Sequence, residues 1–423
     1  MSPLRRWAFR AFTLLLMVGL LEIFSLVVWK VWPPMELTNL SAHQLGVAAM
    51  GSPKAGELEV LHPYLGWAFN PDASQSAVSP SARVPVNELG LADSGPSVRH
   101  KSPDRFVVGV LGGSVAQQMT TIGEHAFCER LAAQPALRGR RVEIVRLAMS
   151  GFKQPQQLMT LNYVLALGGE FDAIINIDGY NETALAIAEN HGHNVFLAYP
   201  RGWHARLQDV VDPRTSSLSF RLLQSRATRQ ERARWIVASP LRHSWTVSLL
   251  WAIQDAVQNR QQISLGVELR EHSRNYGFGF ARQGPRQMYS NDQEMYSSVT
   301  ELWGNCSRQM HHLCAGRGIP YLHFLQPNQY HEGSKPLSAV ELEKYYAPHE
   351  EFAEAIKRGY PLLIQAGRDL REKGIAFHDL TQLFSQETET IYGDYFCHYN
   401  ERGTNLLAEA VADELAKVVA PAD

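Results

Sequence analysis

From about residue 105 to the C-terminus, short apolar segments alternate with longer segments of helix-forming composition, and this alternation restricts the fold more than any other feature. The apolar segments are RFVVGVL, RVEIVRL, FDAIINI, YLHFL and IAFHDL. A β-branched run such as RFVVGVL, without alternating polar residues, is typical of a strand buried on both faces. Strands that alternate with helices predict an α/β fold with a central parallel sheet covered by helices on both faces. In such folds, ligands bind outside the carboxyl ends of the strands.

The helix-forming segments and one long interruption complete this pattern. Helices are expected near residues 123–133, 154–167, 291–317, 339–373 and 401–418. The interval from about residue 199 to 290 does not fit the alternation, and we interpret it as a helical insertion or cap. Within it, Trp245 and Trp251 would lie about 120° apart around the axis of a helix, so only one of them needs to be buried. The arginines between residues 226 and 234 are expected on a solvated helix face.

Residues 11–29 form an apolar run that is interrupted only by Thr13, Glu22 and Ser25. At 1.5 Å per residue, a helix of ~20 residues crosses the ~30 Å hydrocarbon core of a bilayer. Three arginines precede the run and one lysine follows it closely, so the positive-inside rule predicts a cytoplasmic N-terminus with the rest of the chain across the membrane. A cleavable signal peptide is the alternative, but no small-x-small cleavage site follows the run. We therefore expect residues 1–32 to form a cytoplasmic stub and a transmembrane anchor.

Glu22 is the unusual residue of this apolar run. An acidic side chain in a membrane-spanning helix is costly unless it faces a partner or lies near the interface. We therefore expect Glu22 to mark a contact within the membrane.

The rest of the 423-residue chain divides into two further regions. Pro and Gly recur between residues 33 and 103, which predicts an N-terminal extension of short, irregular β elements. Residues 104–423 carry the α/β pattern, with the insertion at about 199–290. The net charge of −2 gives no general electrostatic reason to expect nucleic-acid binding.

Four cysteines are present, and the compartment predicted by the anchor permits disulfides. Cys306 and Cys314 are separated by eight residues of one expected helix, or ~12 Å, which is beyond disulfide reach. Cys128 and Cys397 remain as the pair to test. Four reduced cysteines are the alternative.

Residues able to perform acyl transfer follow the expected strands. Gly113–Ser114 ends the first strand, Ser150–Gly151 follows the second, Asn181 follows the third, and Asp394 and His398 lie near the C-terminus. A nucleophilic serine needs a base, a carboxylate that orients the base, and hydrogen-bond donors for the oxyanion. All of these groups are present, and they follow the expected strands, so a parallel sheet would bring them together at the carboxyl ends of its strands. Each residue also has a structural explanation, as a helix cap, a strand end, an Asx turn or a loop histidine.

With these residues, the chain from about position 105 onward, outside the insertion, resembles the SGNH, or GDSL-type, hydrolase superfamily. In that family a Gly-Asp-Ser or Gly-Gly-Ser after the first strand carries the nucleophile, which corresponds to Ser114. A glycine after the second strand and a Gly-x-Asn after the third donate to the oxyanion, and they correspond to Gly151 in LAMSGF and Asn181 in DGYNE. The segment DYFCHYNERGTNLLAEAV matches the C-terminal block that carries the aspartate and the histidine. The resemblance implies a flavodoxin-like three-layer sandwich, a triad of Ser114, His398 and Asp394, and an oxyanion hole completed by the Ser114 N–H.

Two positions depart from the family pattern. Family members usually place the aspartate three residues before the histidine, whereas Asp394 is four residues before His398 and position 395 is Tyr. Glu182 stands where an aspartate commonly follows the asparagine. The first departure weakens the assignment of Asp394 as the orienting carboxylate.

Two further polar residues follow the fourth strand. Gln326 and Asn328 are expected either to line the substrate pocket or to form a Pro-Asn turn. No His-x-x-x-His or Cys-x-x-Cys spacing predicts a metal site, and no cofactor is expected.

These observations predict a serine esterase or O-acyltransferase that faces the periplasm from the inner membrane of a bacterium. The expected substrates are acyl esters, above all acetyl esters, of a cell-envelope or secreted polysaccharide. By analogy with anchored members of the superfamily, a membrane-bound O-acyltransferase or another inner-membrane protein is the expected partner of the anchor helix. The alternatives are a non-catalytic SGNH-like subunit that binds or assembles a membrane complex, and a lipid esterase with a mobile cap.

Overall fold

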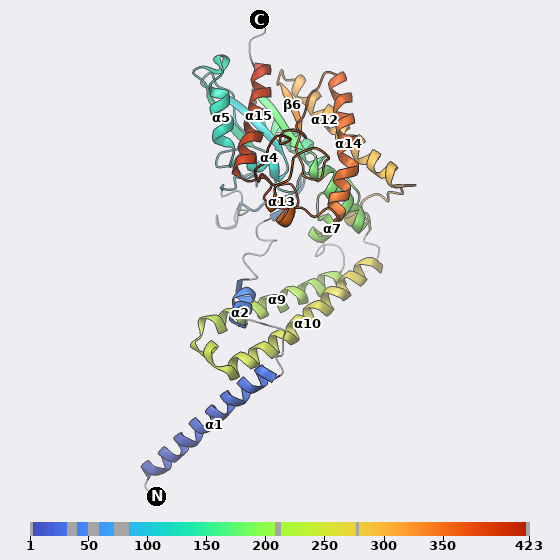
Figure 1. Ribbon diagram of the computed structural model, residues 1–423. Helices are drawn as coiled ribbons and strands as arrows, with labels where there is room; N and C mark the ends of the chain where they lie inside the picture. Colours follow the sequence, from blue (N-terminus) through green and yellow to red (C-terminus); the bar gives the residue numbers. More distant parts are fainter. Residues whose placement is uncertain are drawn as a thin grey trace. The chain divides into compact units, whose positions relative to one another are not determined.

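The computed structural model describes residues 3–31, 40–49, 59–71, 84–207, 213–275 and 279–419. The chain divides into two compact units, which we call the sheet unit and the anchor unit. The sheet unit comprises Ala55–Arg206 and Arg282–Asp423, and the anchor unit comprises Met1–Lys54 and Leu207–Ala281 (Figure 1). The ends of the expected insertion at 199–290 therefore belong to the sheet unit.

The sheet unit contains a five-stranded parallel sheet, which confirms the α/β prediction. Its strands lie in the order β4-β3-β5-β6-β7. Their bounds are β3 (Arg105–Gly112), β4 (Arg141–Arg146), β5 (Ala173–Asp178), β6 (Tyr321–Leu325) and β7 (Ala376–Asp379). In the register of the sheet, Gly112 is paired with Ile177 and Asp178 with Leu325. The loops that follow β3, β5 and β6 therefore leave the sheet along one edge.

The helices of this unit form two groups that pack among themselves. One group is α4 (Ser114–Met119), α5 (Glu124–Ala132) and α15 (Glu401–Val419), and the other is α6 (Gln156–Ala166), α12 (Asp292–Ala315) and α14 (Glu351–Glu372). The remaining short elements are η2 (Pro135–Leu137), the π-helix η3 (Asn181–Asn190), η4 (His191–His193), α7 (Trp203–Arg206) and α13 (Ala339–Lys344). The single helix expected at 339–373 is thus wrong, because α13 and α14 are separate. Pro348 lies in the break, where it disfavours helical geometry for the preceding residue.

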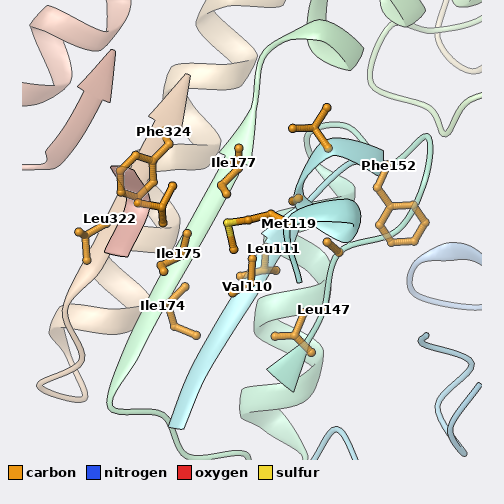
Figure 2. Packing of buried hydrophobic residues seen from close by; sticks show 14 of the residues in the cluster. Val110, Leu111, Met119, Leu147, Phe152, Ile174, Ile175, Ile177, Leu322 and Phe324 are labelled. Carbon is orange, nitrogen blue, oxygen red and sulfur yellow. The ribbon is translucent and has the colours of Figure 1, made fainter. Parts of the chain in front are cut away.

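The sheet is buried on both faces, as its uninterrupted apolar strands predicted. Val107, Val108, Val110 and Leu111 of β3 are fully buried. Figure 2 shows Val110 and Leu111 packed among residues of β5, β6 and α4. Each fully buried aliphatic side chain of this size stabilises the fold by roughly 1.5–3 kcal/mol, so this core holds the loop after β3 rigidly.

The N-terminal extension contains both strands and a helix. An antiparallel hairpin is formed by β1 (Glu59–His62) and β2 (Gly66–Phe69), as expected. Within the same stretch, however, α2 (Leu40–Ala49) is a helix. Its sequence, LSAHQLGVAA, lacks proline and is rich in the strong helix formers Ala and Leu, so helix propensity prevails there. Residues 32–39, 50–58 and 72–83 of the extension lie outside the described residues.

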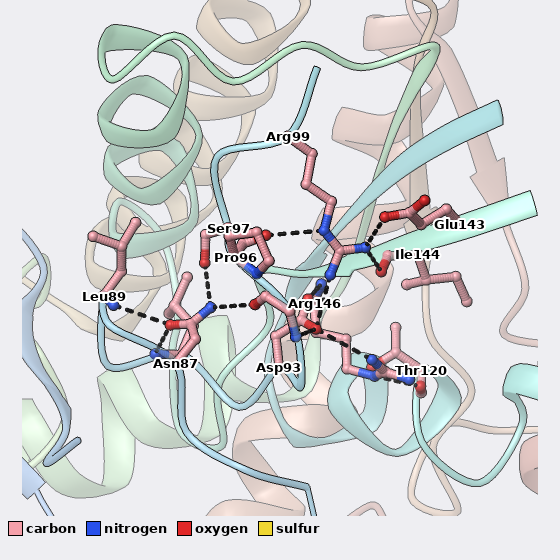
Figure 3. Close-up of polar contacts among 12 residues, drawn as sticks. Asn87, Leu89, Asp93, Pro96, Ser97, Arg99, Thr120, Glu143, Ile144 and Arg146 are labelled. Carbon is pink, nitrogen blue, oxygen red and sulfur yellow. Dashed lines mark hydrogen bonds and ion pairs between the residues drawn. The ribbon is translucent and has the colours of Figure 1, made fainter. Parts of the chain in front are cut away.

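Charged groups hold the edge strand β4 to the loop that precedes β3. Arg99 contacts Asp93 at 3.0 Å and Glu143 at 2.7 Å, and Asp93 also accepts the backbone N–H of Arg146 at 2.9 Å (Figure 3). A groove of about 710 Å³ runs beside these residues. Its lining includes the paired side chains of Arg99, Glu143 and Arg146.

The anchor unit consists of helices. They are α1 (Pro3–Val31), α2, α9 (Pro213–Ala238), η5 (Pro240–His243), α10 (Trp245–Asn275) and α11 (Gly279–Gln283), the last of which extends into the sheet unit. Helix α1 is long and apolar enough to cross a membrane. On α10, Trp251 is buried and Trp245 is 40% exposed, which agrees with the prediction that only one of them is core.

Glu22 has its partners within the chain. Its carboxylate accepts hydrogen bonds from the Ser244 hydroxyl and from the backbone N–H groups of Trp245, at 2.7 Å, and Thr246, at 3.3 Å. These N–H groups begin α10 and have no partners inside that helix. Glu22 therefore caps α10, and its presence in α1 is explained without a second protein.

Asp255 joins three helices of the anchor unit. It accepts from Arg229 of α9 at 2.6 and 3.0 Å, and it lies 2.8 Å from His43 of α2. The expectation of a solvated arginine face is wrong for Arg229, which is buried. Its guanidinium group is buried because the carboxylate of α10 compensates its charge.

All four cysteines are free in the structure. The pair Cys128–Cys397 is therefore not formed. Burial raises the pKa of the Cys128 thiol to about 11, so this side chain stays protonated at neutral pH.

Candidate active site

Ser114 lies at the turn between β3 and α4. Its Oγ atom is 2.7 Å from Nε2 of His398, although 284 residues separate them in the sequence. The preceding Gly113 permits this arrangement. A Cβ atom at position 113 would lie 2.2 Å from Nδ2 of Asn181, so only glycine lets the Asn181 amide pack against the serine turn.

Asp394 reaches His398 despite the four-residue spacing. One carboxylate oxygen contacts Nδ1 of His398, and the other accepts the backbone N–H groups of Phe396, Cys397 and His398 at 2.9, 3.1 and 3.3 Å. The loop therefore curls around the carboxylate and absorbs the extra residue. Burial raises the pKa of Asp394, but the His398 contact and the backbone donors outweigh it and hold this pKa below its ordinary value. The carboxylate is thus ionised at neutral pH.

The segment after β6 supports the His398 loop. Asn328 donates to the carbonyl of Phe396 at 3.0 Å, Gln329 donates to that of Asp394 at 3.0 Å, and Tyr330 donates to that of Tyr395 at 2.6 Å. Asn328 is fully buried, so its amide serves this loop. Gln326 is buried beside the Cys397 thiol, and its contact with substrate stays a prediction.

A buried ion pair holds the start of the same loop. Both Lys335 and Glu341 have side chains at most 1% exposed, and Nζ lies 2.8 Å from Oε2. The Oε1 atom of Glu341 accepts the N–H groups of Ile391 and Tyr392 at 2.8 and 2.9 Å. Burial raises the pKa of Glu341, but Lys335 and these donors outweigh it and lower the pKa overall.

Replacing Glu341 with Gln is expected to destabilise the fold by roughly 3–5 kcal/mol, because it leaves the Lys335 ammonium buried without a counter-charge. Urea unfolding followed by tryptophan fluorescence measures the loss. A carboxylate whose pKa is depressed by folding stabilises the protein above its unfolded pKa and loses this effect as the pH falls through the folded value. The difference between variant and wild type should therefore be largest at neutral pH and shrink in acid.

The control for this prediction is Glu387→Gln, which removes a carboxylate from the more exposed pair with Arg402. Such a pair contributes about 1 kcal/mol or less. Equal destabilisation by the two substitutions would contradict a special role for the buried pair.

Two further donors lie on the loops that follow β4 and β5. Gly151 adopts a φ of +84°, which favours glycine, and in the described part of the chain its N–H has no hydrogen-bond acceptor. Asn181 donates one amide hydrogen to the carbonyl of Phe152 at 2.7 Å. A primary amide carries two hydrogens, so the second is available to a ligand.

Glu182 ties together the loops that carry these donors. Its carboxylate accepts the N–H groups of Gly179, at 2.7 Å, and Gln154, at 3.1 Å, and the side-chain amide of Gln157 at 2.9 Å. Gly179 and Gln154 belong to the loops after β5 and β4, respectively. Burial, together with the charge of Asp178, raises the pKa of Glu182. In the sequence this residue was visible only as a departure from a motif.

Asp178 forms a second buried junction, which no sequence pattern indicated. Its carboxylate contacts Nε1 of Trp303 at 2.8 Å, Nε2 of His323 at 2.9 Å and the Asn176 amide at 2.7 Å. These contacts join β5 to α12 and β6. The third-strand loop, with Asn181, therefore starts from a fixed point.

Within the described residues, no group of three or more His, Cys, Asp or Glu side chains is arranged to hold a metal ion. No family model matches the chain, and no curated protein matches it. The chemistry of the candidate site therefore rests on its own geometry.

Proposed function

We propose that this protein is a serine-dependent ester hydrolase or O-acyltransferase of the SGNH type. The observation that carries the proposal is the continuous contact from Ser114 Oγ to His398 and from His398 to Asp394. A hydroxyl, an imidazole and a carboxylate in this order are the groups that activate a serine for attack on an acyl carbonyl.

In the proposed reaction, Ser114 Oγ attacks the acyl carbon while Nε2 of His398 takes the hydroxyl proton. Asp394 holds the imidazole in the required tautomer and stabilises the imidazolium ion. The oxyanion is bound by the N–H groups of Ser114 and Gly151 and by the Asn181 amide, and each donor is worth ~3 kcal/mol in the transition state. His398 then protonates the leaving alcohol, and the acyl group stays on Ser114. In the second step, water or a sugar hydroxyl attacks the acyl carbon with His398 again acting as the base, and the acyl group leaves Ser114.

The arrangement of strands supports the flavodoxin-like three-layer sandwich as part of this proposal. Numbered along the chain, the five parallel strands lie in the order second, first, third, fourth, fifth. This is the order of doubly wound folds of the flavodoxin type, which bind ligands at the carboxyl ends of the strands beside the first and third. Ser114 and Asn181 follow these two strands.

The apolar helix α1 supports a membrane-bound location. The arginines before it favour a cytoplasmic N-terminus, which would put the sheet unit in the periplasm of a bacterium. We therefore propose acyl esters of an envelope or secreted polysaccharide as substrates, with a membrane-bound O-acyltransferase as partner. This part of the proposal rests on the resemblance, since Glu22 is satisfied within the chain.

A fluorophosphonate probe tests the proposed function. Full-length protein in detergent should be labelled at Ser114, because only a serine activated by a base reacts rapidly with the probe. Labelling should disappear in His398→Ala and persist in Ser102→Ala, which removes a serine from the loop before β3. Absence of labelling in the wild type would instead favour a non-catalytic subunit.

A further inference from the structure

We propose that Arg201 forms a subsite for an anionic group of the substrate, a carboxylate above all, beside Ser114. The inference rests on the proposed function and names its substrate class: acylated sugars that carry a carboxylate. Arg201 belongs to the sheet unit, although the sequence pattern assigned it to the insertion.

The first observation is the position of the Arg201 side chain. A Cβ atom on Gly151 would lie 3.1 Å from Cδ and 3.6 Å from Nη1 of Arg201. The guanidinium group therefore passes directly over the turn whose N–H we assign to the oxyanion hole. At Gly151 the direction of a Cβ atom differs from the direction of the N–H bond. A group bound at Nη1 of Arg201 would therefore lie beside the oxyanion and not at its position.

The second observation is how the guanidinium group is held. Nε and Nη2 contact the two carboxylate oxygens of Glu189 at 2.9 and 2.8 Å. Glu189 lies on η3, the same helix that begins with Asn181. Within the described residues, Nη1 has no hydrogen-bond partner, and the Arg201 side chain is 48% exposed. A fixed guanidinium group with one unused nitrogen is suited to bind a carboxylate.

The charge of Arg201 also acts at the neighbours of the proposed catalytic residues. Burial raises the pKa of Tyr180, which precedes Asn181, and of Cys397, which precedes His398, and Arg201 opposes the rise in both. Arg201 is therefore close enough to both residues for its charge to act on them.

The third observation is an apolar surface on the His398 loop. Tyr395 and Phe396 are 45% and 37% exposed, and their ring centroids are 4.5 Å apart. They lie three and two residues before His398, respectively. Both rings also pack against Phe352 of α14, at 6.0 and 5.2 Å. The proposed site thus has a cation on the Gly151 side, and the loop that carries His398 has partly exposed aromatic rings. This combination fits the carboxylate and the apolar ring face of a uronic acid sugar.

The test compares two polymers that differ in the charge of their carboxyl groups. One is an acetylated polyuronate, and the other is the same polymer with its carboxylates converted to methyl esters. For full-length protein in detergent, kcat/KM for acetate release should be at least tenfold higher on the charged polymer. Arg201→Gln should lower this preference about tenfold, and 0.5 M salt should weaken it in the wild type, because the pair is partly exposed.

A matched control is Arg130→Gln on α5. Arg130 also contacts one carboxylate, that of Asp413, through Nε and Nη2 at 2.6 and 3.0 Å, and its side chain is 54% exposed. This variant should keep the preference of the wild type. Loss of the preference in both variants would show that general surface charge causes it and would overturn the inference.

Two other results would overturn it: no preference in the wild type, or an equal loss on both polymers in Arg201→Gln, which would indicate a structural or oxyanion role. If the wild type releases acetate from neither polymer, calorimetric binding of a deacetylated polyuronate oligosaccharide decides the question. Binding that Arg201→Gln abolishes would support the subsite, even if the proposed function failed. Binding that is absent or unaffected would contradict it.

Discussion

Ser114→Ala is expected to lower the turnover of p-nitrophenyl acetate by about 10⁴-fold or more, to the rate of the uncatalysed background. The substitution removes the oxygen that would form the acyl–enzyme bond in the proposed reaction, and that oxygen is the atom in contact with Nε2 of His398. His398→Ala should cause a loss of the same order, because an unassisted hydroxyl attacks slowly. The double variant should be no slower than either single one, since the two groups act as a unit.

The measurement is the steady-state rate together with the burst of p-nitrophenolate in the first turnover. Ser114 is the first residue of α4 and only its hydroxyl is removed, so circular dichroism and the unfolding midpoint should match the wild type. Rates that stay within a few-fold of the wild type in both variants would eliminate the proposed nucleophile and base. If the wild type and both variants all show only the background rate, a non-catalytic SGNH-like subunit would be the better interpretation.

Asp394→Asn is expected to lower kcat by about 10³–10⁴-fold, with a much smaller change in KM. The amide keeps an oxygen that can accept the N–H groups of Phe396 and Cys397, so the loop should hold its shape. It cannot supply the negative charge that the imidazolium ion requires. It can also donate to Nδ1 of His398, which fixes the wrong tautomer.

This result bears directly on the unusual spacing of Asp394 and His398. Asp413→Asn, in an exposed ion pair on α15, is the control and should leave kcat unchanged. If Asp394→Asn reduced kcat by less than threefold, the carboxylate would only shape the loop. Another group would then have to orient His398.

The sheet could be predicted from the sequence because its signal is local. Each strand is a short apolar run, and each run carries its burial pattern within itself. The same kind of signal located α12 and α15 to within two residues. It failed between α13 and α14 and at α2, where a few residues of proline or alanine outweighed the surrounding pattern.

The residue types of the candidate site were also determined by the sequence. A serine after a Gly-Gly turn, a glycine, an asparagine and a C-terminal histidine each follow an expected strand or precede an expected helix. Because parallel strands end at one edge of a sheet, their order along the chain was enough to expect that they meet.

Only the tertiary structure decided how these residues are held. Asp394 reaches His398 because the loop closes around its carboxylate, and Glu182 joins two loops through backbone N–H groups. Arg201 lies over Gly151 although fifty positions separate them. Such contacts depend on which loops meet in space, and loop sequences have no periodic pattern from which these meetings can be predicted. The sequence therefore determined which groups are available, and the closure of the loops decided which of them act together.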